Sequence, residues 1–312
     1  MKLLLTGSTG FVGLAFLKHC ISHHKEVIVA VRSISATLPA SVTQVVVGDL
    51  SASQDWSQAL LGVDVVVHLA ARAHIMDEAE SEPLMVYREA NTLATVNLAK
   101  QAAKAGVKRF VFISSIKVNG EFTRIGKSFL PDDSNIPKDA YGISKYEAEQ
   151  ALKIITIETG MAVVIIRPPL AYGSGVKGNF ASMVRWLQKG IPLPLGSVNN
   201  QRSLVALDNL VDFIHLCCHH PKAANETFLI ADGIDVSTTE LLHKAAKALN
   251  VPVHLIPVPV SWMLFVAKLL GKEAVANRLF SNLQVDISKA RKLLGWQPVV
   301  TMDEQLLKMF EK

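Results

Sequence analysis

Cysteine is scarce in this chain of 312 residues, which has only three, two of them adjacent (Cys217, Cys218). These cannot form a disulfide framework, so we expect a protein of a reducing compartment, the cytoplasm. A long hydrophobic run is also missing, because three prolines interrupt the uncharged residues 248–267. The apolar stretch that remains, 260–270, is too short to cross a bilayer. We expect it to form a buried or partner-facing helix, with a weak contact to a membrane surface as the alternative.

Charge of one sign is not concentrated anywhere along the chain. The formal net charge is only +5 at pH 7, and the Lys and Arg residues are scattered. This argues against nucleic acid as a partner and favours a small anionic ligand. Histidine and cysteine gather once, between His215 and His220, but no Glu lies between His215 and His219 as it does in zinc helices. We therefore expect a core helix over 210–218 and no metal.

Glycine, by contrast, is arranged in a pattern at the N-terminus. An apolar strand, Lys2 to Leu5, runs into T-G-S-T-G-F-V-G at residues 6–13. Glycines spaced G-x-x-G-x-x-G let a strand turn into a helix whose N-terminus faces a pyrophosphate. A helix pattern and a second apolar strand, Glu26 to Val31, follow, which favours a dinucleotide site over a ligand-free turn.

Strand and helix patterns alternate through the first half of the chain. Strand-like runs are Gln44 to Val47, Asp64 to Leu69, Arg109 to Ser114 and Ala162 to Arg167, with helix patterns at Glu82 to Ala105 and Ala140 to Thr159. This alternation predicts an α/β fold with a doubly wound parallel sheet of the Rossmann type. The pattern becomes irregular after Pro168. We expect residues 1–170 to bind the dinucleotide and 171–312 to be mainly a smaller substrate-binding domain, with some segments returning to the sheet.

Tyr141 and Lys145 stand four residues apart at the start of a predicted helix and so share one face. Lowering a phenol pKa from about 10 to about 7 requires roughly 4 kcal/mol, which a fixed Lys and a nicotinamide cation would supply together. This pair also occurs by chance on helices. Nearby, Ser114 and Ser115 end a strand, and Asn91 lies in the preceding helix. Their side chains either meet a ligand beyond the strand ends or only satisfy backbone groups.

In this order, the motifs resemble those of the extended short-chain dehydrogenase/reductases, and among them the nucleotide-sugar epimerase/dehydratase/reductase group. The resemblance covers nearly the whole chain. It rests on residues 6–13, Gly48-Asp49-Leu50, His68-Leu69-Ala70-Ala71, Asn91 with Thr95-Val96-Asn97-Leu98, Ser114-Ser115, the Tyr141/Lys145 pair and Arg167-Pro168.

The resemblance implies the roles of the catalytic and cofactor-binding residues. Tyr141 is the general acid/base, Lys145 lowers its pKa and holds the nicotinamide ribose, and Ser115, three residues before Val118, orients the substrate oxygen. Asp49 and Leu50 would meet the adenine, and Ala70 and Ala71 the diphosphate and ribose side. The implied cofactor site comprises Thr6, Gly7, Gly10, Phe11, Val12, Gly13, Arg32, Asp49, Leu50, Leu69, Ala70, Ala71, Asn91, Tyr141, Lys145 and Pro168.

The second half of the chain supplies the implied substrate residues. Asn179 opens a helix near the nucleotide diphosphate, and Leu193 and Pro194 belong to a strand along the uracil or thymine ring. Arg202 meets the diphosphate through its planar guanidinium. Arg278 is either a second clamp on the diphosphate or a surface arginine.

Two departures from the family pattern refine the expectation. Arg32 stands where an acidic residue would bind the adenosine 2′-hydroxyl, so it could pair with a 2′-phosphate. The cofactor is therefore NADP or NAD, with NADP favoured. Asn119 replaces the Tyr of V-Y-G, and Ile116-Lys117 replaces the acidic residue of the dehydratases, which argues against dehydration.

We therefore expect hydride transfer at C4 of a UDP-hexose or UDP-N-acetylhexosamine in surface-polysaccharide biosynthesis, by a 4-epimerase or a 4-ketoreductase. The alternatives are a reductase of another carbonyl substrate and a non-catalytic regulator that senses a dinucleotide. By the same resemblance we expect a homodimer through the helices Glu82 to Ala105 and Ala140 to Thr159.

Overall fold

A seven-stranded parallel sheet forms the centre of the computed structural model, which describes residues 1–73, 83–133 and 135–311. The strand order is β3-β2-β1-β4-β5-β6-β9. The bounds are β1 (Lys2–Thr6), β2 (Glu26–Val31), β3 (Thr43–Val46), β4 (Val65–His68), β5 (Arg109–Ile113), β6 (Ala162–Arg167) and β9 (Thr227–Leu229). The order reverses between β1 and β4, and ligands of such sheets bind beyond the carboxyl ends of the strands at that point. The predicted Rossmann-type sheet is confirmed.

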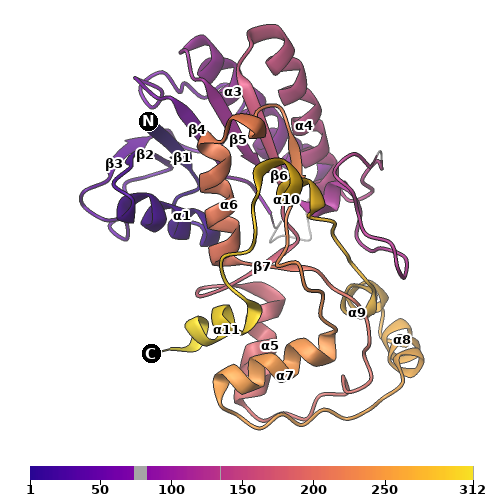
Figure 1. Cartoon of the computed structure of the whole chain (residues 1–312). Coiled ribbons are helices and arrows are strands. Elements are labelled where there is room, and N and C mark those ends of the chain that lie inside the picture. The colour runs from indigo at the N-terminus through magenta and orange to yellow at the C-terminus, as the bar shows by residue number, and fades with distance from the viewer. Residues whose placement is uncertain (74–82, 134, 312) are drawn as a thin grey trace.

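Helices cover both faces of the sheet, which explains why its central strands are apolar on both sides. On one face α1 (Phe11–Ser22) packs against α6 (Leu207–His219), and on the other α3 (Ala94–Lys104) packs against α4 (Ala140–Thr159) (Figure 1). Each face has its own apolar core, one around Phe16 and Phe213 and the other around Phe110 and Leu152.

The helix predictions are confirmed in part. The helix α4 has the predicted bounds, because Asp139 caps its first turn by accepting from Gly142 N and Gly160 ends it at φ 73°. The predicted helix 82–105 is instead three segments, α2 (Pro83–Tyr87), a π-helical segment (Arg88–Leu93) and α3, and its first residue lies outside the described residues. A π-helical turn bulges the backbone, and such turns are frequent at functional sites.

The second half of the chain forms a lobe below the sheet (Figure 1). It contains α5 (Gly178–Gln188), α7 (Thr238–Leu249), α8 (Val260–Leu269), α9 (Glu273–Phe280), α11 (Met302–Phe310) and the strand pair β7 (Leu170–Tyr172) and β8 (Leu204–Ala206). Three segments of this half lie at the large sheet: α6, β9 and α10 (Ser288–Leu294). The division at residue 170 stays a prediction.

Of the two expectations for the helix at 260–270, burial is wrong, because no residue of α8 is buried, and a partner-facing helix stays a prediction. Its outward side chains face solvent: Trp262 is 70% and Leu269 71% exposed. In the described part of the chain, no helix is both long enough and apolar enough to span a bilayer.

Candidate functional site

The turn from β1 into α1 forms a cradle that only glycine permits. Gly7 has φ +74°, and a Cβ there would lie 2.7 Å from the backbone nitrogen of Ala70. A Cβ at Gly13 would lie 2.0 Å from the carbonyl oxygen of Gly7. The N–H groups of the first helical turn have no acceptor within the helix, and the Ser8 hydroxyl is buried without a hydrogen-bond partner. Unpaired donors around a glycine turn fit a pyrophosphate. The predicted site did not include Ser8, although it lies inside the motif.

The adenosine end of the predicted cofactor site lies at the exposed edge formed by β2 and β3. Arg32, directly after β2, forms an ion pair of 3.5 Å with Asp49. Both side chains are open to solvent, at 80% and 86% exposure. Leu50 packs against the core beside them. The structure therefore brings together Arg32, which was predicted to bind a 2′-phosphate, and Asp49, which was predicted to contact the adenine.

His68, at the end of β4, connects the glycine cradle to the helices of the opposite face. The Thr95 hydroxyl donates to the Asn91 carbonyl at 2.7 Å, so it accepts from His68 Nε2 at 2.9 Å. His68 Nδ1 is then an acceptor for the Thr6 hydroxyl at 2.7 Å. Burial lowers the pKa of His68 to about 3, which keeps the ring neutral. Thr6 Oγ1 also accepts from Ala70 N at 3.1 Å, so this network positions the loop of Leu69, Ala70 and Ala71.

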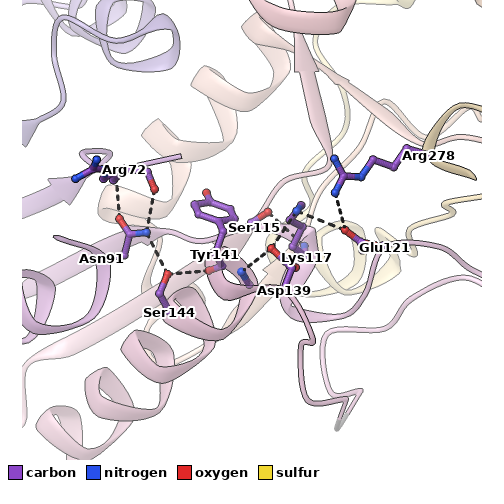
Figure 2. Close-up of polar contacts among 10 residues, drawn as sticks. Arg72, Asn91, Ser115, Lys117, Glu121, Asp139, Tyr141, Ser144 and Arg278 are labelled. Carbon is purple, nitrogen blue, oxygen red and sulfur yellow. Dashed lines mark hydrogen bonds and ion pairs between the residues drawn. The ribbon is translucent and has the colours of Figure 1, made fainter. Parts of the chain in front are cut away.

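Asn91 bridges two elements of the site from the π-helical segment (Figure 2). Its amide accepts from the backbone nitrogen of Arg72 at 2.8 Å and donates to the Arg72 carbonyl at 3.0 Å. It also donates to Ser144 Oγ, whose hydroxyl donates to the Tyr141 carbonyl at 2.8 Å. Asn91 therefore satisfies backbone groups of Arg72, which is one of the two interpretations of this residue given above. Its contacts also connect the loop after β4 to the first turn of α4.

The pKa values of Tyr141 and Lys145 are both shifted by their surroundings in the site. Burial, then the Asp139 carboxylate and the Tyr87 phenol, raise the pKa of Tyr141 to about 12, while a hydrogen bond with the Ser115 side chain acts in the opposite direction. Lys145 Nζ donates to the Ile113 carbonyl at 2.8 Å, and burial lowers its pKa to about 7. A lower pKa for Tyr141 therefore stays a prediction for the cofactor-bound protein.

The two serines after β5 have different environments. The Ser114 hydroxyl donates to Glu149, which is fully buried and forms an ion pair with Arg167. The Ser115 side chain instead lies next to Tyr141 and accepts from Lys117 N at 3.3 Å. Ser114 is thus engaged by a buried carboxylate and Ser115 lies beside Tyr141, and the role of Ser115 towards a substrate oxygen stays a prediction. Pro168, the last predicted cofactor residue, supports this loop by accepting from Ile116 N at 3.0 Å.

Lys117 is a charged residue of the site that the sequence reasoning did not select. Its Nζ lies 3.0 Å from Asp139, 3.5 Å from Glu121 and 5.9 Å from the centre of the Tyr141 ring (Figure 2). It therefore offsets the carboxylate that raises the pKa of Tyr141. The only signal in the sequence was a lysine two residues after Ser115.

The predicted substrate residues form no single cluster. The Arg202 guanidinium donates to the Arg278 carbonyl at 2.6 Å, so the two arginines are neighbours, but the Arg278 side chain turns to Glu121 at 3.5 Å. Asn179 lies exposed at the start of α5, which confirms that it opens a helix.

The expected strand at Leu193 and Pro194 is wrong, because residue 193 makes only an isolated bridge with Leu255. The Leu193 side chain is buried in the apolar cluster of the lower lobe, its N–H donates to the His254 carbonyl at 2.9 Å and its carbonyl accepts from Ile256 N at 2.8 Å. Pro194 is exposed.

The histidines of α6 pack against those of α1 far from this site. The ring centres of His19 and His215 are 4.9 Å apart, and those of His215 and His219 5.1 Å. Cys217 and Cys218 are buried in the apolar core of this face, together with Cys20 of α1. Across residues 1–73, 83–133 and 135–311, no group of three or more His, Cys, Asp or Glu side chains is arranged to hold a metal ion.

Comparison with known proteins identifies the family and the fold. The model of the NAD dependent epimerase/dehydratase family matches residues 3–231. A UDP-glucose 4-epimerase of Vibrio cholerae is 51% identical over 304 residues, which cover 97% of this chain and 92% of the relative. An N-acetyl-α-D-glucosaminyl-diphospho-ditrans,octacis-undecaprenol 4-epimerase of Escherichia coli O157:H7 is 28% identical, over 84% of this chain and 77% of the relative. A Thermus thermophilus UDP-glucose 4-epimerase solved with NAD shares the fold, with a TM-score of 0.77, 20% identity and coverage of 99% and 98%.

Proposed function

This chain belongs to the NAD dependent epimerase/dehydratase family, and we propose that it is a nucleotide-sugar 4-epimerase that inverts C4 of a UDP-hexose. The observation that carries the proposal is the position of Tyr141 and Ser115 beyond the carboxyl end of β5, beside a glycine cradle that fits a pyrophosphate. The 51% identity to a UDP-glucose 4-epimerase favours epimerisation over net reduction.

The chain's own residues would handle the proton and the orientation of the sugar. When bound, a nicotinamide dinucleotide supplies the hydride acceptor at C4. Tyr141 Oη would accept the proton of the C4 hydroxyl, and would return it to the C4 oxygen when the hydride returns to the opposite face of the sugar. Ser115 holds the C4 oxygen. Lys145 follows Tyr141 by four residues in α4, and we expect its amine to regain a proton when the cofactor is bound and to lower the pKa of the phenol.

The 2′ group of the cofactor is the finer part of the proposal, in which Arg32 selects NADP. The Arg32 side chain is exposed and its counter-ion, Asp49, is equally exposed, so a phosphate can replace this partner at little desolvation cost. We expect the Arg32→Ala variant to lose affinity for NADPH roughly tenfold and to keep its affinity for NADH. Equal loss for both cofactors, or none, would leave NAD as the cofactor.

The sugar carrier has a second candidate, a polyprenyl diphosphate. The relative from Escherichia coli acts on an undecaprenyl-diphosphate sugar by its name. Arg202 and Arg278 would meet a diphosphate, which both carriers contain. The observation that favours this candidate is the exposed apolar face of α8. The helix α8 packs against α9, which carries Arg278.

A homodimer through α3 and α4 is also part of the proposal. The outer surface of α4 exposes Ile154 (55%) and Ile157 (85%), which a partner subunit would cover. A light-scattering mass equal to the 33.9 kDa of one chain would refute it.

The test of function is interconversion of UDP-glucose and UDP-galactose by the purified protein. We expect Tyr141→Phe to lower kcat roughly 10²- to 10⁴-fold, and Tyr146→Phe, a matched change in the same helix, to leave it unchanged. Parallel assays use the undecaprenyl-diphosphate sugar and a UDP-4-keto sugar with NADPH. Stoichiometric NADPH oxidation without interconversion would make the protein a 4-ketoreductase. If Tyr141→Phe turns over as fast as wild type, the regulator alternative returns.

A further inference from the structure

The helix α8 has two apolar faces, although a helix on the surface of a protein normally has one. Its inner face packs on the apolar cluster of the lower lobe through Val260 and Met263. Its outer face presents Trp262 (70% exposed), Phe265 (63%), Val266 (48%) and Leu269 (71%). These four follow the spacing i, i+3, i+4, i+7, so they form one continuous stripe. An exposed stripe of this kind marks a surface that another body covers.

The charges around the stripe indicate which body that is. Residues 241–272 contain no Asp or Glu, whereas Lys268 and Lys272 lie exposed at the C-terminal end of α8. Such lysines lay their methylene chains along apolar surface and hold their ammonium groups at the level of phosphates. Tryptophan prefers the same boundary between headgroups and acyl chains. The acidic groups nearby begin with Glu273, at the start of α9.

We propose that the outer face of α8 docks on the surface of an anionic phospholipid membrane. Trp262, Phe265 and Leu269 enter the boundary between headgroups and acyl chains, and Lys268 and Lys272 meet the lipid phosphates. The helix has 10 residues, which at about 1.5 Å each cannot cross the bilayer, so the contact is peripheral. A second copy of the chain fits the face less well, because its residues 241–272 would offer Lys268 and Lys272 no acidic partner.

The docking face adjoins the candidate site through one helix. The helix α9 packs against α8 and carries Arg278, whose side chain reaches Glu121 at the rim of the site (Figures 1 and 2). Membrane docking would therefore hold the substrate lobe at the lipid surface, whichever sugar carrier is used.

The test is co-sedimentation of the full chain with phosphatidylcholine vesicles that contain or lack phosphatidylglycerol. We expect binding to the anionic vesicles that weakens with added salt. The triple variant Trp262→Ser, Phe265→Ser, Leu269→Ser should bind at least roughly tenfold more weakly, because its apolar anchor is removed. Ile234→Ser, which changes a 71% exposed apolar residue elsewhere, is the matched control and should bind as wild type.

Fluorescence and activity separate the proposal from its rivals. Trp262→Phe should abolish the blue shift that anionic vesicles cause in the emission, whereas Trp186→Phe, at a 48% exposed site, should keep it. Both variants should turn over a soluble UDP-sugar as wild type does, so failure of docking and failure of the proposed function are distinguishable. The proposal would be overturned if the triple variant binds the anionic vesicles as wild type does, or if the wild type does not bind them. It would also be overturned if the wild type does not bind vesicles and the triple variant has a lower light-scattering mass than wild type.

Discussion

Replacing the buried Glu149 with glutamine is expected to destabilise the protein strongly without changing the shape of the side chain. Glu149 is fully buried and Arg167 is 4% exposed, and the two form a bidentate ion pair behind Ser114. The glutamine leaves the Arg167 guanidinium without a counter-charge inside the core. Asn119 Oδ1 and the Pro131 carbonyl still accept from Arg167, but neither carries a charge.

The magnitude follows from the cost of an unpaired buried charge. Removing one partner of a buried ion pair costs about 3–5 kcal/mol, and the shape-conserving Gln belongs at the lower end, about 3 kcal/mol. That is a large share of a total stability of about 5–15 kcal/mol. For a chain of this size it lowers the thermal midpoint by roughly 6 °C, at about 2 °C per kcal/mol.

The assay is urea and thermal unfolding of the cofactor-free protein, with Glu147→Gln as the control. Glu147 lies two residues earlier in α4 and pairs with Arg88 at 2.6 Å, but both side chains are about one-third exposed (30% and 37%). Solvent screens that pair, so its loss should change the midpoint far less. The double variant Glu149→Met, Arg167→Met should recover part of the loss, because no unpaired charge remains. Equal effects of Glu149→Gln and Glu147→Gln would refute the reasoning.

Three further outcomes are expected. Burial lowers the pKa of Lys145 from 10.5 to about 7, so between these pH values the unfolded chain holds a proton that the folded chain lacks. The free energy of unfolding therefore rises with pH over this range, by at most about 1.4 kcal/mol per pH unit. The Lys145→Met variant should lack this rise in urea titrations at pH 7 and 9.5. Burial and His19 lower the pKa of His215 from 6.5 to about 4, so its contribution is present above pH 6.5 and lost as the pH falls towards 4; His215→Leu should lose less thermal stability between pH 6.5 and 4.5 than wild type. Gly13→Ala places a Cβ 2.0 Å from the Gly7 carbonyl oxygen, so NADPH affinity, measured by fluorescence titration, should fall roughly tenfold or more, and unchanged affinity would remove the cradle from the cofactor site.

Much of the sheet could be predicted from the sequence because its signals are local. The strands Glu26–Val31 and Ala162–Arg167 and the helix Ala140–Thr159 have the predicted bounds. Continuous apolar runs specify buried parallel strands, and Asp139 and Gly160 supply a helix start and stop within the same stretch of chain. The π-helical segment that divides the helix after residue 82 has no such signal.

In the candidate site, too, the features with local sequence signals could be predicted and those made by distant contacts could not. The glycine turn, the Tyr141/Lys145 spacing and the serines after β5 were visible because each lies within a few residues of chain. The hydrogen bond from Ser114 to Glu149 and the position of Lys117 over the Tyr141 ring could not be seen, because they join residues 35 and 24 positions apart.

The sequence by itself determined the order of strands and helices, the glycine cradle and the identity of the candidate catalytic residues, because local backbone preference and short spacing carry that information. Only the tertiary structure decided that Ser114 is held by Glu149, that Leu193 is buried and that α8 keeps an apolar face in solvent. These outcomes depend on which segments, distant in sequence, pack against one another in the fold. The sequence does not show whether a given apolar residue is covered by packing or left exposed.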